Sequence, residues 1–511
     1  MAKKDIFKLQ NGSDIRGVAC DGVAGENINL TAEISVKIGA AFVDWLSIKT
    51  GKKACELKIG IGRDSRITGE NLLNAVACGI LQKGADIVDC GLATTPAMFM
   101  SCVFKETDFD GSVMITASHL PFNRNGIKFF DKQGGLDHED ITIILEIAED
   151  SNVQCTMRNS QLKKFDLLSL YSAHLKNVIC RELECDENKK PLSGLKIVVD
   201  SGNGASGFFV EKILKPLGAD TKGSQFLEPD GLFPNHIPNP ENKEAMKAIK
   251  TATVSNNGDL GLIFDTDVDR MSCVFSNGEE VNRDSIIALI SAILAQDYPH
   301  STIVTDSVTS DRLTYFLEKV LGLNHFRFVR GYKNVINRQI ELNQAGTVCP
   351  LAMETSGHGA LSENYFLDDG AYLAVKIIIA LAKAKRQGRT LESLIEKLPP
   401  AGKEGEYRFK ILCEDFEDYG KSVLKEVRNR AEKSGYNLPQ AYEGVRISFE
   451  KPELNGWILF RMSLHDPVMP VNLEGQSEED KEKLKEIVKK LVSGFEDLDI
   501  SSICRPQPSS V

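Results

Sequence analysis

The sequence predicts an α/β protein that has three similar α/β domains with mixed sheets, followed by a smaller C-terminal α+β domain. Its 511 residues are enough for about three to four domains. One pattern recurs three times: an apolar strand that ends in Asp, a turn with Gly or Ser, an amphipathic helix, and a second strand entered through Gly. The copies begin with KIGIGRD (58–64), LKIVVD (195–200) and TIVTD (302–306). Strands that lack alternation and are joined by helices are typical of a sheet covered on both faces.

A glycine at the end of each repeat helix supports this interpretation. Gly84, Gly218 and Gly322 follow the three strands at similar spacing. Glycine is the residue that most often closes a helix, because it adopts the left-handed conformation at little cost. We therefore expect α/β domains at 1–166, 167–280 and 281–400.

The C-terminal part of the chain breaks this pattern. Strands are expected at 407–412, 444–449, 457–461 and 468–473, around one helix. A last helix is expected to begin after Ser477, which forms a capping box with Asp480. The preceding segment PPAG (399–402) is typical of a linker, so the α+β domain is expected at 401–511.

The composition is that of a folded protein, with 42% hydrophobic and 26% charged residues. A net charge of -11 argues against a surface that binds nucleic acid or anionic lipid. The twelve cysteines are scattered and form no C-x-x-C pair, as expected in a reducing compartment. The longest apolar runs are too short to span a bilayer. The sequence thus predicts a cytoplasmic protein that binds neither nucleic acid nor membrane.

The segment GSVMITASHLPFNRNGIKFF (111–130) carries the strongest indication of chemistry. An apolar run leads into a polar turn with Ser118 and His119, and Lys128 follows. A serine at the end of a strand, beside a histidine and near cations, is suited to carry a phosphoryl group. On this segment alone, an ordinary Ser/Thr-rich turn is an equally good interpretation.

A second segment, GLIFDTDVDR (261–270), has the pattern of a metal site. Asp265, Asp267 and Asp269 stand at alternate positions after an apolar strand, and carboxylates are the ligands that a divalent cation such as Mg2+ prefers. An EF-hand is excluded because Arg270 occupies the place of the required Gly and Ser276 that of the bidentate Glu. A solvated acidic loop is the remaining alternative.

Two further segments have polar residues suited to a sugar phosphate. In METSGHG (353–359), Glu354, Ser356 and His358 offer donors and acceptors for sugar hydroxyls. In NGWILFRMSLHDP (455–467), a strand leads to Arg461 and Ser463, an arrangement that can bind a phosphate. Taken alone, the first of these segments is equally well explained as a plain loop.

Cations also stand at several turns near strand ends, namely Arg16, Arg63, Arg66 and Lys333, and Arg446 offers a further charge to the phosphate site of the fourth segment. In an acidic protein, this placement favours a small, multiply charged anion in a cleft. For any one of them, a surface salt bridge is the alternative.

A competing motif, G-x-G-x-x-G, occurs at 202–207 after a predicted strand. Dinucleotide-binding folds have the motif in this context. However, the strand ends in the charged Asp200, and the same strand-turn-helix unit recurs elsewhere without the motif. A dinucleotide-dependent oxidoreductase is therefore the less favoured alternative.

Taken in order, the four polar segments resemble the active-site loops of the α-D-phosphohexomutase superfamily, which contains phosphoglucomutases, phosphomannomutases and phosphoglucosamine mutases. The resemblance extends from SDIRG (13–17) to NGW (455–457) and Arg461, nearly the whole chain. The family fold implies four domains around a central cleft.

The resemblance also implies a role for each matched residue. Ser118 would be the phosphoserine, and it would hold Mg2+ together with Asp265, Asp267 and Asp269. The transferring phosphoryl group would be surrounded by His119, Lys128, Arg16 and Arg270, with Lys128 or His119 as the proton carrier. Sugar hydroxyls would be bound by Glu354, Ser356 and His358. The residues expected at the phosphate that does not react are Arg461, Ser463, Lys333, Arg446 and His465.

The implied activity is that of an intramolecular phosphotransferase, a phosphohexomutase that interconverts hexose 1-phosphate and hexose 6-phosphate of glucose or mannose. Phosphorylated Ser118 would give its group to the monophosphate, and the resulting 1,6-bisphosphate would turn and return its other phosphate. The expected ligands are hexose phosphates and hexose 1,6-bisphosphate, and the expected state is a monomer or homodimer.

The fourth segment departs from the family pattern, because Leu464, His465 and Asp466 replace residues that are usually small or polar. This departure motivates an alternative, a glucose-1,6-bisphosphate synthase that takes phosphoryl groups from a sugar bisphosphate and releases the intermediate. A catalytically silent sugar-phosphate sensor is a further alternative. The sequence does not select the hexose or the general base.

Overall fold

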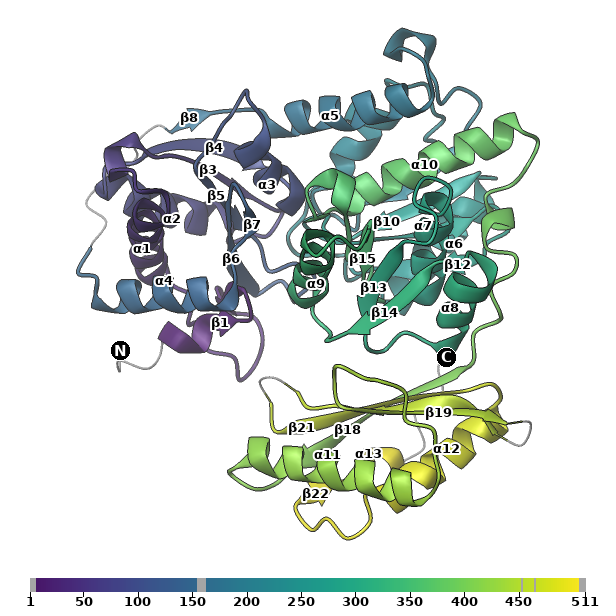
Figure 1. Ribbon diagram of the computed structural model, residues 1–511. Coiled ribbons are helices and arrows are strands. Elements are labelled where there is room, and N and C mark those ends of the chain that lie inside the picture. The colour runs from purple at the N-terminus through teal and green to yellow at the C-terminus, as the bar shows by residue number, and fades with distance from the viewer. Residues whose placement is uncertain (1–5, 154–161, 452–453, 464–465, 505–511) are drawn as a thin grey trace. The chain divides into compact units, whose positions relative to one another are not determined.

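The computed structural model describes residues 6–153, 162–451, 454–463 and 466–504 (Figure 1). The chain forms two compact units. Unit 1 comprises Met1–Ile286 and Ser356–Leu394, and unit 2 comprises Ile287–Thr355 and Ile395–Val511. Within the described residues, no helix has both the length and the apolar composition needed to cross a membrane.

Unit 1 begins with an eight-stranded mixed sheet. Its strands are β1 (Gln10–Asn11), β2 (Asp14–Val18), β3 (Lys58–Arg63), β4 (Asp86–Leu92), β5 (Gly111–Ile115), β6 (Arg124–Asp131), β7 (Gly134–Gly135) and β8 (Lys163–Lys164). The order is β1-β2-β6-β5-β3-β4-β8, with β7 paired to β6. β3 is parallel to β4 and β5, whereas β5 and β6 are antiparallel.

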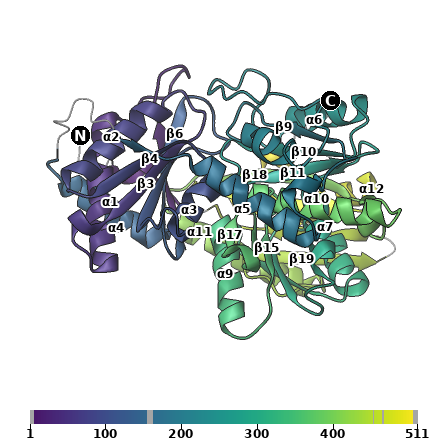
Figure 2. The same cartoon turned by 90° about the horizontal axis from the view of Figure 1, so that it is seen from above.

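Helices cover both faces of this sheet. They are α1 (Ala32–Thr50), α2 (Gly69–Gln82), α3 (Thr95–Val103) and α4 (His138–Asp150). α1, α2 and α4 lie on one face and α3 on the other (Figures 1 and 2). Phe42 and Leu46 of α1 are fully buried against strand residues such as Ile59 and Val113, and each such side chain contributes about 1.5–3 kcal/mol when it leaves water.

A second mixed sheet of unit 1 has the order β12-β11-β10-β9, with strands β9 (Ile197–Asp200), β10 (Leu260–Phe264), β11 (Met271–Phe275) and β12 (Glu280–Val281). β9 and β10 are parallel, and the other pairs are antiparallel. Its helices are α5 (Leu167–Glu182) and α6 (Lys243–Ser255). Met246 and Ile249 of α6 pack against Val198, Ile263 and Val274 of the sheet.

The remaining part of unit 1 is a hairpin followed by a long helix. The hairpin pairs β16 (Gly359–Leu361) with β17 (Leu367–Asp368) in antiparallel fashion. α10 (Gly370–Arg386) follows directly and is capped by Asp369, which accepts a hydrogen bond from the Tyr372 N–H. α10 packs along α5 (Figure 1).

The chain enters unit 2 through α7 (Asp284–Leu294). There β13 (Thr302–Asp306) pairs in parallel with both β14 (Asn324–Phe328) and β15 (Leu351–Met353). The associated helices are α8 (Asp311–Tyr315) and α9 (Tyr332–Gln344).

The C-terminal part of unit 2 is an antiparallel sheet with the order β19-β20-β21-β18-β22. Its elements are β18 (Lys403–Ile411), α11 (Phe416–Lys433), β19 (Val445–Lys451), β20 (Leu454–Phe460), β21 (Val468–Gly475), α12 (Glu478–Leu491), β22 (Leu498–Asp499) and α13 (Ser501–Cys504). β18 starts earlier than predicted, because charged side chains on its exposed face alternate with buried Gly405, Tyr407 and Phe409.

Several local predictions are confirmed. Gly84, Gly218 and Gly322 all have φ values in the left-handed region, at 88°, 91° and 68°. Ser477 caps α12 by accepting a hydrogen bond from the Asp480 N–H. The repeat helices are less regular than expected, because 209–214 and 316–320 are π-helical. The boundaries proposed for four domains remain a prediction.

Candidate active site

Three of the four polar segments form the same backbone turn. β5, β10 and β15 each lead into a loop, at 116–119, 266–269 and 355–358, that begins with threonine. The third residue of each loop is left-handed, namely Ser118 (φ 50°), Val268 (φ 68°) and Gly357 (φ 95°). Only glycine adopts this conformation without strain. The fourth residues of these loops are His119, Asp269 and His358.

The Ser118 hydroxyl is buried among charged groups of unit 1. Its Oγ lies 3.0 Å from Oδ2 of Asp265 and accepts a hydrogen bond of 2.8 Å from Nη2 of Arg270. Nδ1 of His119 lies 3.4 Å away. The structure therefore brings together Ser118 and Asp265, which are far apart in the sequence.

Lys128 enters the same cluster through the sheet. It lies on β6 opposite Met114 of β5, and its Nζ is 2.6 Å from Oδ2 of Asp269 and 3.4 Å from Oδ2 of Asp267. Burial opposes the ionisation of Asp269, but Lys128, His358 and Arg270 together hold its pKa below the usual range. Burial and the charges of Asp269 and Asp267 raise the pKa of Asp265 well above its usual value.

The three carboxylates form a site that fits a divalent cation. One oxygen from each of Asp265, Asp267 and Asp269 lies within 4.8 Å of the other two, and all three residues are buried. Oδ1 of Asp267 and Oδ1 of Asp269 accept no hydrogen bond from any described residue. Buried carboxylate oxygens without donors are costly, and a hard cation satisfies them. This aspartate triad therefore fits the metal site that the sequence predicted.

The start of α3 holds the triad in place. Thr95 donates hydrogen bonds from its N–H to the Asp267 carbonyl oxygen, at 2.9 Å, and from its hydroxyl to Oδ2 of Asp267. Sequence reasoning missed this residue. A signal was present, because TTP at 94–96 has the pattern of a helix start.

Arg16 and Arg270 control the charge of His119. Arg16 lies on β2 and forms an ion pair of 2.8 Å with Asp14. Burial, together with the charges of Arg270 and Arg16, lowers the pKa of His119 to about 2. His119 is therefore a neutral imidazole at physiological pH.

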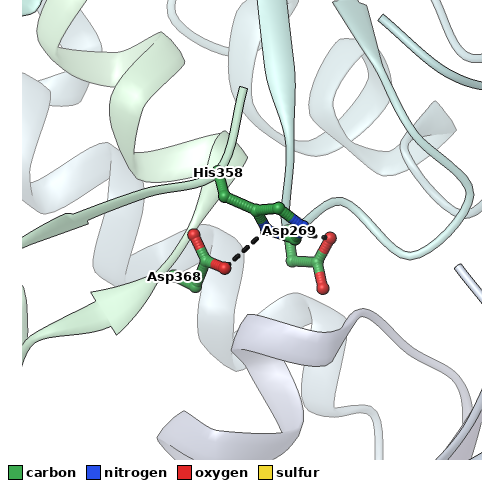
Figure 3. A group of neighbouring side chains, drawn as sticks. All are labelled: Asp269, His358 and Asp368. Atoms are coloured by element: carbon green, nitrogen blue, oxygen red, sulfur yellow. Dashed lines mark ion pairs between the residues drawn. The ribbon is translucent and has the colours of Figure 1, made fainter. Parts of the chain in front are cut away.

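His358 has the opposite environment (Figure 3). Its Nδ1 lies 2.5 Å from Oδ2 of Asp368 and 3.8 Å from Oδ1 of Asp269. Burial disfavours the imidazolium, but Asp368 and Asp269 outweigh this effect and raise the pKa of His358. These three side chains could also surround a cation, yet the short His358–Asp368 contact is that of an ion pair. Asp368 was not among the predicted site residues.

In unit 2, Glu354 lies in a second buried acidic cluster. Oε1 of Glu354 accepts a hydrogen bond of 2.7 Å from the Gly331 N–H, at the start of α9. Oδ2 of Asp306 accepts hydrogen bonds from the hydroxyl and the N–H of Thr355, at 2.8 and 3.3 Å. Burial and the charge of Glu354 raise the pKa of Asp306 to about 7. Lys333 stands in the first turn of α9.

Ser356, which follows Thr355 in the sequence, belongs to unit 1. Its hydroxyl is buried and has no hydrogen-bond partner among the described residues. A buried hydroxyl without a partner is unusual in native proteins and is typical of an atom that awaits a ligand or water.

The residues predicted to bind the phosphate that does not react differ in their hydrogen-bond partners and burial. Arg446 is buried, stacks 4.2 Å from the Trp457 ring, and donates hydrogen bonds to Asp311 Oδ1 (2.8 Å) and the Ser307 carbonyl (3.1 Å). Its guanidinium thus supports the fold. Arg461 follows β20, is half-buried, and burial lowers its pKa.

Ser463 closes the same turn as Arg461. Its N–H bonds the Val468 carbonyl at 3.0 Å, and its hydroxyl accepts a hydrogen bond of 3.3 Å from the Asp466 N–H. His465 and Leu464 lie outside the described residues.

The glycine motif at 202–207 has a different explanation from dinucleotide binding. A Cβ added to Gly204 would lie 2.8 Å from the carbonyl oxygen of Thr266, and the Ala205 N–H donates a 2.8 Å hydrogen bond to the same oxygen. The glycine thus permits the close approach of the loop that carries the aspartate triad.

Comparison with known proteins is consistent with this geometry. Models described as phosphoglucomutase/phosphomannomutase, alpha/beta/alpha domains I, II and III, match residues 8–153, 169–278 and 282–401. A phosphoglucomutase/phosphomannomutase from Thermococcus kodakarensis is 31% identical over 489 residues, which cover 95% of this chain and 98% of that protein.

Solved structures have the same fold. A phosphoglucomutase/phosphomannomutase family protein from Burkholderia thailandensis superposes with a TM-score of 0.76 at 24% identity, over 97% of this chain and 99% of that chain. A variant of Aspergillus fumigatus N-acetylphosphoglucosamine mutase, solved in complex with glucose 1,6-bisphosphate, gives a TM-score of 0.52 at 14% identity, over 88% of this chain and 79% of that chain.

Proposed function

Because the chain belongs to the phosphoglucomutase/phosphomannomutase family, it is a hexose phosphate mutase, and we propose that it works through a phosphoserine at Ser118. The proposed reaction interconverts the 1-phosphate and 6-phosphate of glucose or mannose through a hexose 1,6-bisphosphate. The observation that carries the proposal is the position of Ser118 Oγ, which lies between Asp265 and Arg270 in a left-handed turn.

In the proposed first half-reaction, a sugar hydroxyl attacks the phosphorus on Ser118 and the bond from phosphorus to Ser118 Oγ breaks. Arg270, which already donates a hydrogen bond to Oγ, would stabilise the negative charge that develops there. A divalent cation, proposed to be Mg2+, would be held by the aspartate triad and the phosphate on Ser118, and would neutralise charge on the transferring group. Arg16 would add a further positive charge beside His119.

The proton of the attacking hydroxyl needs a carrier, for which we propose His119 or Lys128. Burial and the charges of Arg270 and Arg16 lower the pKa of His119 to about 2, which makes its imidazole a weak base and favours Lys128 of the two. Lys128 is held between Asp267 and Asp269 and can donate a proton to the seryl oxygen. The reverse transfer, from the bisphosphate back to Ser118, uses the same groups in the opposite protonation order.

We propose that the sugar and the second phosphate are bound by the other predicted residues. Sugar hydroxyls are assigned to Glu354, Ser356 and His358, and the buried Ser356 hydroxyl supports this assignment. The phosphate that does not react is assigned to Arg461, Ser463, Lys333 and His465. Arg446 is assigned a supporting place behind them, since its donors already bond Asp311 and Ser307. A protein of the same fold from Aspergillus fumigatus was solved in complex with glucose 1,6-bisphosphate, which supports a hexose bisphosphate as a ligand.

No observation favours the alternative of a bisphosphate synthase. That alternative rests on Leu464, His465 and Asp466, and the first two lie outside the described residues. Both activities share the phosphoserine chemistry, and they differ in the phosphoryl donor and in whether the bisphosphate is released.

A phosphorus NMR time course tests the proposal. The full-length protein is mixed with Mg2+, glucose 1-phosphate and a catalytic amount of glucose 1,6-bisphosphate, with mannose 1-phosphate in a parallel sample. We expect conversion to the 6-phosphate while the bisphosphate stays constant. Consumption of the bisphosphate without isomerisation, or full activity of Ser118→Ala, would contradict the proposal.

A further inference from the structure

Arg66 is the largest fully buried side chain in the described part of the chain. It follows the strand-end Asp64 by two residues, at the carboxyl end of β3. A buried guanidinium is costly unless a negative charge and hydrogen-bond acceptors surround it. The groups that surround the Arg66 guanidinium therefore indicate the role of this side chain.

Both Nη groups of the Arg66 guanidinium donate hydrogen bonds to backbone carbonyl oxygens. Nη1 donates to the carbonyl oxygens of Pro121 (2.8 Å) and Arg124 (2.9 Å). Nη2 donates to the carbonyl oxygens of Ser118 and Leu120, the latter at 2.6 Å. Nε lies 3.3 Å from Oδ2 of Asp64 in an ion pair. Four of these five partners are backbone carbonyls of the segment from Ser118 to Arg124, which connects the loop at 116–119 to β6.

Asp64 holds the same loop from the other side. Its Oδ2 accepts a 2.7 Å hydrogen bond from the Thr116 hydroxyl, and Thr116 Oγ1 in turn accepts a 2.9 Å hydrogen bond from the Ser118 N–H. Oδ1 of Asp64 accepts a hydrogen bond from the Arg66 N–H. The N–H and the carbonyl of Ser118 are therefore both fixed by this strand end.

These hydrogen bonds to the backbone of Ser118 matter because Ser118 has an unfavourable backbone conformation. Its φ of 50° is left-handed, a conformation that a non-glycine residue adopts only with strain. The matching position at 355–358 is Gly357, which adopts φ 95° without that cost. Strand-end Asp306 also bonds the threonine of its loop, but the residue two positions later is Val308. Only the loop with serine at the strained position has an arginine there.

We propose that Arg66 is a positioning residue for phosphoryl transfer, which holds Ser118 in the left-handed conformation that directs its Oγ at Asp265 and Arg270. The inference rests on the proposed role of Ser118 as phosphoryl carrier. Lysine cannot replace Arg66, because one ammonium group has three donors and no planar fork to reach four carbonyls.

The test compares Arg66→Lys with the wild-type protein. Full-length protein with Mg2+ receives glucose 1,6-bisphosphate, and the rate of phosphoryl uptake is followed by rapid quench and intact mass. We expect a loss of about 10- to 100-fold, as when a reacting group is displaced by about 1 Å. We also expect the KM for glucose 1-phosphate to change by no more than about twofold, because Arg66 is buried beneath the loop.

Arg430→Lys is the matched control. Arg430 of α11 also clamps carbonyl oxygens, those of Leu491 and Ser493 at 3.1 and 2.7 Å, and its Nε bonds Glu426. It lies in unit 2, whereas Ser118 lies in unit 1. We expect this variant to lose thermal stability without any change in the uptake rate, which separates positioning from general stabilisation.

The possible results distinguish the role of Arg66 from the role of Ser118. Uptake by folded Arg66→Lys at the wild-type rate overturns the inference while leaving the phosphoserine proposal intact. Absence of uptake by the wild-type protein overturns the phosphoserine proposal, and with it the inference. If Arg66→Lys does not fold, Thr116→Val takes its place: removal of this hydroxyl frees the Ser118 N–H, and an unchanged uptake rate would overturn the inference.

Discussion

The loops at 116–119 and 355–358 have one backbone turn but different third residues. In both, a strand-end aspartate accepts a hydrogen bond from the loop threonine, at 2.7 Å for Asp64 and Thr116 and at 2.8 Å for Asp306 and Thr355. The third residue is serine in one loop and glycine in the other. In the first loop, where a reactive side chain occupies the strained position, Arg66 adds hydrogen bonds to the backbone around Ser118, and the second loop has Val308 at the matching place.

The fourth residue of both loops is histidine, and there the difference is electrostatic. Burial and the positive charge of Arg270 lower the pKa of His119 to about 2. Asp368 raises the pKa of His358 above its usual value, against the effect of burial. Both imidazoles stand at the fourth position of their loops and burial acts to lower the pKa of both, so the different charges around them account for the opposite shifts of their pKa values.

The largest expected effect comes from the serines of the two loops. Ser118→Ala should lower turnover by about 10^3-fold or more, because no phosphoenzyme forms. Ser356→Ala removes a buried hydroxyl proposed to bind the sugar, and it should mainly raise KM, by roughly 5-fold. Steady-state kinetics of both variants checks this. Equal losses in kcat would mean that the two loops do not differ in role.

The next effect distinguishes the aspartate triad from the neighbouring cluster of Asp269, His358 and Asp368. Asp267→Asn should weaken Mg2+ binding at least about 10-fold, since it removes a buried charge that the cation would neutralise. Asp368→Asn should leave the Mg2+ dependence of the rate unchanged. Titration of activity with Mg2+ in chelator-treated protein measures both. The reverse pattern would move the cation to the second cluster.

A smaller effect concerns the strand-end aspartate of the second loop. The pKa of Asp306 in the fold is about 7, above the usual 3.8. Its contribution to stability is therefore full below about pH 4 and is lost as the pH rises to about 7, by up to about 4 kcal/mol. Asp306→Asn keeps an acceptor for Thr355 and should flatten this loss.

Denaturant unfolding of Asp306→Asn and wild-type protein between these two pH values measures the difference. The variant should gain stability relative to wild type as the pH rises. A constant difference across the range would show that Asp306 is ionised in the folded protein.

The smallest effect concerns Gly357. Gly357→Ala should cost about 1–3 kcal/mol, because φ is 95° and the added Cβ would lie 2.7 Å from the Met271 carbonyl oxygen. Gly388→Ala is the control, since its φ is 67° but nothing lies within 4 Å. It should cost only about 1 kcal/mol. Thermal unfolding compares the two, and equal costs would mean that the contact with Met271 is relieved.

Much of the fold could be predicted from the sequence, because the repeated strands end in Asp and their helices end in Gly. The grouping of Ser118 with the aspartate triad came from the family resemblance of the polar segments, and not from the strand and helix pattern. The identity of the three turns could not be predicted in this way. Serine and valine at positive φ give no local signal, because tertiary contacts impose that conformation.

Two further residues show why the rest was missed. Arg66 was interpreted as a cation for a bound anion, and its partners are instead carbonyl oxygens. The residue type does not reveal which acceptor the fold presents. Asp368 reaches His358 through the hairpin register that pairs it with Ala360, and a register is set by pairing between strands that local sequence does not fix.

The pairing of Met114 with Lys128 has a consequence for how the chain tolerates insertions and deletions. Side chains alternate between the faces of a strand, so a deletion of one residue within 124–128 would turn Lys128 away from Asp269 to the opposite face. Two deleted residues would restore the face. Insertions and deletions in this short segment are therefore tolerated only if they preserve which face of the sheet Lys128 occupies.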